Sequence, residues 1–151
     1  MAEDPQQHAI RLNGAWELRC LPHWPNDHAS LSALAGAVDT VGRVNLPCAE
    51  PVDRSTADDT VLLLTRRFNR PSNLSPGQPI TLLIEGLPAD AALYFNGAAM
   101  EVGAHHATTK LPIGQRLADN NRLDLVLRSD AFLRQGSVRL VITDAGGRSS
   151  C

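Results

Sequence analysis

Few residues have the type and spacing for hydrolytic chemistry. Asp58 and Asp59 form the only adjacent acidic pair outside the N-terminal tail. Glycoside hydrolysis usually needs two carboxyl groups roughly 5 to 10 Å apart. Neighbouring side chains on a strand point to opposite faces, and those in a loop are solvated, so we expect no catalysis from this pair. The sequence contains no nucleophile elbow, no glycine-rich phosphate loop and no HExxH motif.

His105 and His106 are the only adjacent histidines in the chain. Adjacent side chains on a strand diverge, so these two imidazoles could not chelate one ion without ligands from elsewhere. The favoured interpretation is a pair of surface residues, and we predict no metal site.

The segment 21–30, LPHWPNDHAS, combines an aromatic ring with polar side chains in a predicted loop. Trp24 could be a platform for the apolar C–H face of a pyranose ring, and Asn26, Asp27 and His28 could bind its hydroxyl groups. The alternative is that Trp24 folds back over one end of the protein, because large aromatic side chains are usually mostly buried. The sequence leaves both interpretations open.

A second polar loop, 48–60, carries charged groups that could hydrogen-bond to sugar hydroxyls. The alternative is a solvated acidic loop, which is the commoner role for such a segment. The candidate carbohydrate-binding residues from the two loops are Trp24, Asn26, Asp27, His28, Asp53, Arg54, Asp58 and Asp59.

The segments between these loops resemble half-buried strands. Strand-like runs recur at 15–20, 40–47, 60–68, 79–86, 91–95, 121–129 and 136–143, and most alternate apolar with polar residues. Such alternation is typical of strands with one face on a core and one in water. Asn96 and Gly97 predict a type I′ hairpin turn. About eight strands with short connections predict an all-β fold, an antiparallel β-sandwich.

Helical signals are weak. The segment 29–38 could form a short helix, and 113–121 could form one or two turns.

Tyr94 has the opposite parity to its neighbours, so we expect it to face away from the core or to lie at an interface. We expect Arg66 or Arg67 to pair with an acid such as Glu85 across the sheet. The predicted core is Trp16, Phe68, Leu82, Ile84, Leu93, Phe95, Leu123, Leu125 and Leu140.

The composition is that of an ordinary globular protein of 151 residues, with 43% hydrophobic and 20% charged residues. The net charge of −2, the absence of a basic block and an aromatic share of 4% argue against nucleic-acid binding. No apolar run is long enough for a membrane span, so we expect no membrane partner.

We expect a cytoplasmic protein, because the N-terminus lacks the features of a signal peptide and the three cysteines form no CxxC motif. A Cys20–Cys48 disulfide is the less favoured alternative. The predicted organisation is a flexible segment at 1–10, one β-sandwich domain at 11–144 and a disordered tail at 145–151.

Several short blocks occur in an order that matches a known family. They are Leu-x-Gly-x-Trp at Leu12, Gly14 and Trp16; a strand-ending Pro47; an arginine-rich strand with Arg66, Arg67, Phe68 and Pro71; the block Asp90, Ala91, Leu93, Phe95, Asn96 and Gly97; Gly-x-His at Gly103 and His105; and Asn-x-Leu at Asn121 and Leu123. Together they resemble the N-terminal sugar-binding domain of glycoside hydrolase family 2, the family of β-galactosidases, β-glucuronidases and β-mannosidases.

The resemblance implies a jelly-roll sandwich of the galactose-binding domain-like type. In the family, the catalytic glutamates lie in a separate barrel domain, so the resemblance implies no enzyme activity for this stretch of sequence. It also implies that the loop 48–60 could reach toward a bound sugar. Galactose-binding-like domains often hold structural calcium, but no ligand cluster can be assigned here, and we predict no cofactor.

The function implied is non-catalytic carbohydrate binding, with a carbohydrate or glycoside as the partner. The alternative from another class is a protein-interaction or assembly module, which would bind a protein partner or form a homodimer. The first requires Trp24 or Tyr94 to be exposed beside polar groups, and the second requires an apolar patch on one sheet.

Overall fold

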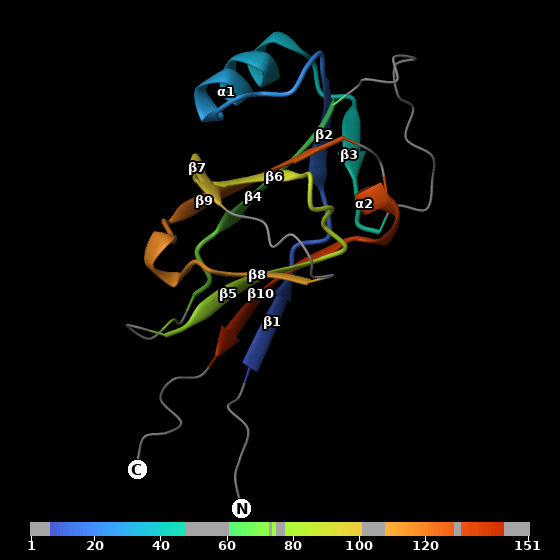
Figure 1. Ribbon diagram of the computed structural model, residues 1–151. Helices are drawn as coiled ribbons and strands as arrows, with labels where there is room; N and C mark the ends of the chain where they lie inside the picture. Colours follow the sequence, from blue (N-terminus) through green and yellow to red (C-terminus); the bar gives the residue numbers. More distant parts are fainter. Residues whose placement is uncertain are drawn as a thin grey trace, which may run out of the picture.

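The computed structural model describes residues 7–47, 61–72, 74, 78–100, 108–128 and 131–143. Two antiparallel sheets pack face to face, as Figure 1 shows. The six-stranded sheet has the order β3 (Gly42–Val44), β2 (Trp16–Leu21), β4 (Val61–Asn69), β9 (Asn120–Leu127), β6 (Ala92–Phe95) and β7 (Ala98–Met100). The four-stranded sheet has the order β1 (Gln7–Arg11), β10 (Ser137–Thr143), β5 (Ile80–Glu85) and β8 (Thr108–Pro112). The predicted β-sandwich is confirmed.

The main core lies between the two sheets and consists of the side chains that point inward from the strands. Trp16, the largest of these side chains, is 0% exposed, and its Nε1 donates to the Leu12 carbonyl at 2.6 Å. Phe68 packs against this core at one end, with its ring 6.2 Å from that of Phe95. The helix α2 (Ala131–Gln135) closes one side of the sandwich with its buried Phe132. The predicted core residues lie in this cluster or pack against it.

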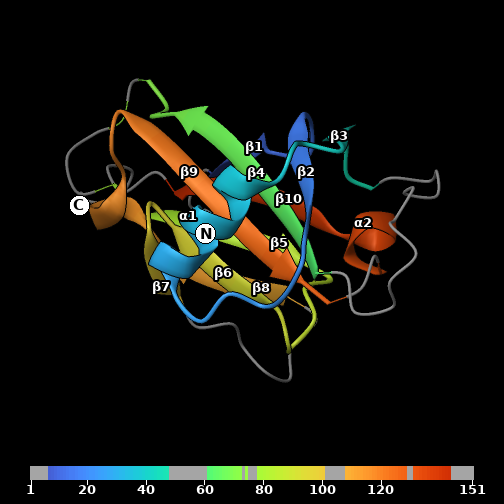
Figure 2. The same ribbon diagram turned by 90° about the horizontal axis from the view of Figure 1, so that it is seen from above.

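A second, smaller core lies on the outer face of the six-stranded sheet, beneath helix α1 (His28–Ala37). Figures 1 and 2 show α1 lying over this sheet, on the side away from the four-stranded sheet. Leu31 of the helix packs among Leu63, Val126 and Tyr94 of the strands. The expected outward orientation of Tyr94 is therefore correct, and its interface is with α1 of the same chain.

The hairpin from β6 to β7 has the predicted two-residue turn. Phe95 pairs with Ala98 across it, and the φ angles of Asn96 and Gly97 are +51° and +85°. Both residues therefore adopt the left-handed conformation that a type I′ turn requires. The expected helix at 29–38 is also confirmed as α1, with bounds that differ by one residue.

The structure corrects some local expectations and confirms others. Residues 7–10, which we placed in a flexible segment, lie in β1, because this strand pairs with β10 along the edge of the four-stranded sheet. The segment 113–121 forms one turn of 3-10 helix, η1 (Gly114–Arg116), before β9 begins, which agrees with the expected one or two turns. Arg67 pairs with an acid across its sheet, as expected, but the acid is Glu17 of β2, at 3.2 Å. Glu85 lies in the four-stranded sheet and pairs with Arg139 at 3.2 Å.

The described ranges contain two α-helices and one cysteine, Cys20. Neither α-helix in these ranges is long and apolar enough to cross a membrane. Cys20 is a free thiol that packs partly against the main core. The less favoured alternative, a disulfide from Cys20 to Cys48, is therefore not formed.

Candidate functional site

The first predicted loop, residues 21–30, leads into α1. Its side chains cap this helix and pack beneath it. Asp27 is the N-cap of α1, and its Oδ1 accepts a hydrogen bond from the Ser30 N–H at 2.8 Å. The backbone N–H of Ser30, and then its hydroxyl, lowers the pKa of Asp27 from its ordinary value. An anionic N-cap also interacts favourably with the helix dipole. The carboxylate of Asp27 therefore stabilises the helix.

Trp24 is not an open platform. Its side chain is half-buried and packs against the small core under α1. The guanidinium carbon of Arg128 lies 4.0 Å from the centre of the indole ring, in cation–π geometry. This contact occupies a ring face that a pyranose would need. The folded-back alternative describes Trp24 better than the sugar platform does.

His28 also has a packing role. Its ring lies 5.6 Å from that of Tyr94 in a tilted arrangement, and it faces Gly97 closely enough that an added Cβ there would lie 3.5 Å from its Cε1. Its Nε2 is buried and has no hydrogen-bond partner among the described residues. Of the four predicted residues in this loop, Asn26 alone is exposed and without a hydrogen bond to the described part of the chain.

The second predicted group, Asp53, Arg54, Asp58 and Asp59, lies outside the described residues, as do His105 and His106. In the ranges that the structure describes, no three His, Cys, Asp or Glu side chains gather closely enough to hold a metal ion.

A groove that sequence reasoning missed lies beside η1, where β4 ends and β5 begins. It has a volume of about 800 Å³. Apolar groups from Leu74, Pro79, Ile80 and Pro112 line it. Four long polar side chains that can hydrogen-bond also line it: Arg70, Gln78, Gln115 and Arg116. None of the described residues that line the groove is Asp or Glu, so these residues supply no carboxyl pair for acid–base chemistry.

The backbone around the groove is fixed by hydrogen bonds from several elements. The Ile113 N–H donates to the Ile80 carbonyl at 2.9 Å, which joins the start of η1 to β5. The Arg70 N–H donates to the Asp119 carbonyl at 2.9 Å. The Arg116 carbonyl accepts from Nδ2 of Asn96 at 3.1 Å. The side chains of Arg70 and Arg116 therefore extend from a rigid frame.

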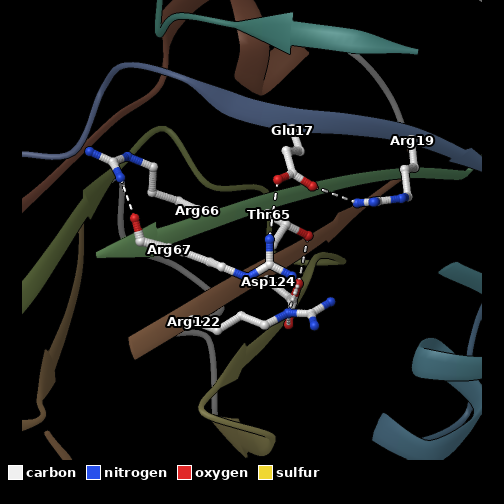
Figure 3. Close-up of polar contacts among 7 residues, drawn as sticks. All are labelled: Glu17, Arg19, Thr65, Arg66, Arg67, Arg122 and Asp124. Carbon is white, nitrogen blue, oxygen red and sulfur yellow. Dashed lines mark hydrogen bonds and ion pairs between the residues drawn. The ribbon is translucent and has the colours of Figure 1, made fainter. Parts of the chain in front are cut away.

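A polar network occupies the part of the outer face of the six-stranded sheet that α1 leaves uncovered (Figure 3). Glu17 accepts from Arg19 at 3.1 Å and from Arg67 at 3.2 Å. The neighbouring carboxylate, Asp124, is 0% exposed. It accepts from the Thr65 hydroxyl at 2.7 Å and from Nε of Arg122 at 3.1 and 3.0 Å.

The strand register places four side chains from separate parts of the sequence side by side. Glu17 is opposite Thr65, Thr65 is opposite Asp124, and Asp124 is opposite Tyr94. The four side chains therefore form a row across β2, β4, β9 and β6. The row separates the apolar area beneath α1 from the arginine-rich ends of β4 and β9.

Solved structures provide the comparison with known proteins. A β-glucuronidase from Bifidobacterium dentium, complexed with coumarin-3-O-glucuronide, superposes with a TM-score of 0.70 at 15% identity, over 96% of this chain and 31% of the enzyme. The chain shares its fold with part of a glycosidase. A putative β-galactosidase from Bacteroides fragilis matches with a TM-score of 0.65 at 16% identity, over 91% of this chain and 23% of the enzyme.

A β-glucuronidase from Faecalibacterium prausnitzii gives a TM-score of 0.64 at 12% identity, over 96% of this chain and 33% of the enzyme. No protein-family model and no curated protein sequence matches the chain. The chain thus spans a third or less of each of these solved enzymes. These likenesses confirm the fold that the sequence resemblance to family 2 glycosidases implied.

Proposed function

We propose that this chain is a non-catalytic carbohydrate-binding domain and that its sugar binds in the groove beside η1. The observation that carries the proposal is the combination of two guanidinium and two carboxamide side chains with an apolar lining in a groove of about 800 Å³. Ligand pockets of about 300 to 1,000 Å³ with a few convergent polar groups are typical of small-molecule sites. The groove is large enough for one or two sugar rings.

The chemistry of the lining suits a polyol. A guanidinium or a carboxamide presents several hydrogen-bonding groups in one plane, which can pair with adjacent sugar hydroxyls. The proline and aliphatic side chains can contact the C–H faces of the ring. Neither Trp24 nor Tyr94 provides the exposed aromatic platform expected from the sequence, because both pack beneath α1. The described part of the groove has no aromatic ring either, so we expect binding to require millimolar sugar.

The protein-interaction alternative has less support. It requires an apolar patch, but in the described ranges only Ile10 and Val41, at 37% and 49% exposed, are large exposed hydrophobic residues. Ile10 lies on β1 of the four-stranded sheet, and Val41 lies just before β3 of the six-stranded sheet. Two such separated side chains do not form a docking patch.

The test is a titration of the protein with methyl glycosides of galactose, glucose, mannose and glucuronic acid. Binding is monitored through the amide chemical shifts in NMR spectra. We expect saturable shifts for Gly114, Gln115 and Arg116 with at least one glycoside. Arg116→Ala and Gln115→Ala should each weaken binding about tenfold, as expected for the loss of a strong hydrogen bond. Lys110→Ala, an exposed charge on β8 outside the groove, is the matched control.

No saturable shift with any of these glycosides would refute the proposal. Self-association of the protein in analytical ultracentrifugation, together with absent sugar binding, would instead favour the assembly module.

A further inference from the structure

Two like charges face each other on neighbouring strands at the edge of the polar network. Arg67 of β4 is directly opposite Arg122 of β9. Like charges in this position repel each other and destabilise a sheet. Two residues further along the same face, Asn69 is directly opposite Asn120. Alternation along the strands therefore places all four side chains on the outer face, as a two-by-two patch that we call the donor patch.

The donor patch lines a hollow of about 600 Å³. The described residues lining this hollow include three arginines and three asparagines, but no Asp or Glu. The acids that pair with Arg67 and Arg122, Glu17 and Asp124, belong to the row of side chains behind the hollow. The hollow is consequently surrounded by hydrogen-bond donors and positive charge.

The known contacts of the arginines leave donors available. Arg122 uses its Nε toward Asp124, and its two terminal nitrogens have no partner among the described residues. Arg67 uses only Nη1 toward Glu17, and its side chain is 60% exposed. Arg66, at the rim of the hollow, donates from Nη1 to the Arg67 carbonyl (Figure 3), while its Nε is buried without a partner in the described ranges.

Asp124 and Glu17 also orient the guanidinium groups. Asp124 is fixed by the Thr65 hydroxyl, so the Arg122 side chain is held at its Nε end. A guanidinium that is oriented in advance loses less entropy when it binds a ligand. The carboxylates thus act as supports for the arginines rather than as direct contacts of a ligand in the hollow.

We propose that the donor patch binds an oxyanion group, namely a carboxylate, sulfate or phosphate. The Arg67 and Arg122 guanidiniums would each donate to the oxyanion, and this contact would relieve their mutual repulsion. Asn69 and Asn120 would donate to the remaining oxygens or to hydroxyls beside the anion. This site is separate from the groove beside η1 and does not depend on the proposed carbohydrate function.

The experiment uses calorimetric and NMR titrations of the full chain with sodium sulfate and sodium phosphate, at an ionic strength held constant with sodium chloride. Glucuronate and glucose 6-sulfate distinguish an anion carried on a sugar from the free inorganic ion, and glucose is the uncharged control. We expect saturable shifts at Asn69, Asn120 and Arg122 with the anions and none there with glucose. The sugar anions should bind more tightly if the asparagines contact hydroxyls.

Two pairs of variants test the assignment. Asn120→Asp adds a negative charge within the patch without changing the size of the side chain, and it should weaken anion binding more than tenfold. Its control, Asn26→Asp, adds the same charge at another exposed position. Arg67→Gln should weaken binding about tenfold. Its control, Arg43→Gln, removes an exposed charge from β3 in the same sheet and should change binding less than about twofold.

The proposal is overturned if none of the anions binds in excess of chloride, or if Asn120→Asp and Arg67→Gln bind them as the wild type does. Neutral-sugar shifts at Gly114 and Gln115 test the other site. Either proposal can therefore fail while the other stands.

Discussion

Nδ2 of Asn96 donates to Oδ1 of Asn121 at 3.0 Å, joining the tip of the β6–β7 hairpin to the start of β9. Asn121 is 3% exposed and also bonds to both the N–H and the carbonyl of Ala118, each at 2.9 Å. Oδ1 of Asn96 accepts from the Arg122 N–H at 2.8 Å. These two residues belong to separate blocks of the family resemblance, and the structure gives both a role in holding strands together.

Replacing Asn121 with Ala should lower the free energy of unfolding by about 2 to 3 kcal/mol, because the buried Asn121 amide bonds to the Ala118 N–H and carbonyl and to the Asn96 amide, and all of these bonds would be lost. Urea denaturation followed by circular dichroism measures this change. Asn120→Ala is the control, since the adjacent side chain is exposed. A loss of less than about 0.5 kcal/mol in Asn121→Ala would contradict the proposed role of this amide.

Some strands of this fold could be predicted from the sequence, and others could not. Strands β2, β5, β9 and β10 were predictable because their inward residues mostly alternate with polar ones, and β4 because it begins with a run of four apolar residues. The hairpin was predictable because Asn-Gly has a strong local conformational preference. Strand β1 was not, since its residues QHAIR are mostly exposed at a sheet edge and carry no apolar periodicity. Strand β8 was missed for a similar reason, because TTKLP is short and mixed.

The candidate sites depend on long-range register, which no local pattern contains. Arg67 and Arg122 become neighbours only when β4 and β9 pair in one particular register. The groove beside η1 requires residues 70 and 116 to approach from different connections. Trp24 and Asp27 had the residue types of a sugar site, but α1 uses both for its own docking and capping. Residue type therefore suggested possible chemistry but could not show which groups were already engaged.

Gly136 should not tolerate a side chain. A Cβ at this position would overlap the ring of Phe132 at Cε1 and would lie 2.6 Å from its carbonyl oxygen. Gly136→Ala must displace the buried Phe132 ring or the backbone of α2, and we expect a loss of about 2 kcal/mol or more. Thermal unfolding measures it, with Gly36→Ala as the control, because a Cβ at Gly36 meets nothing within 4 Å. Equal stability of the two variants would contradict the close approach of α2 to β10.

Asp27 should make stability depend on pH in the acid range. Its pKa is lower in the folded protein because the Ser30 N–H and hydroxyl hydrogen-bond to the carboxylate. The stabilisation is therefore present above the unfolded pKa and is lost as the pH falls through the folded pKa. Asp27→Asn keeps an N-cap side chain but cannot titrate, so it should reduce the acid-range slope without unfolding α1. Urea midpoints measured at several pH values test this, and an unchanged slope would contradict it.

Tyr94 should show a linked effect in the alkaline range. Burial under α1, with a smaller contribution from the charge of Asp27, raises its pKa above the ordinary value of 10.0. The stability linked to the neutral phenol is present below the unfolded pKa and is lost as the pH rises through the folded pKa. Tyr94 is the chain's only tyrosine, so phenolate absorbance reports it directly. A folded-state midpoint at or below that of the urea-unfolded chain would contradict the prediction, and Tyr94→Phe should remove the transition.

Replacing Trp24 decides between its two interpretations. If its ring packs under α1 and against Arg128, Trp24→Ala should lower the free energy of unfolding by about 2 kcal/mol through lost apolar burial and the lost cation–π contact. Arg128→Gln removes only the cation and should cost about 0.5 to 1 kcal/mol. Neither variant should alter glycoside shifts at Gln115 and Arg116, because the groove beside η1 does not include Trp24. The opposite result, in which Trp24→Ala unfolds like the wild type yet no longer binds glycosides, would place the sugar at the beginning of α1. Urea denaturation and glycoside titration of the same two variants distinguish these outcomes.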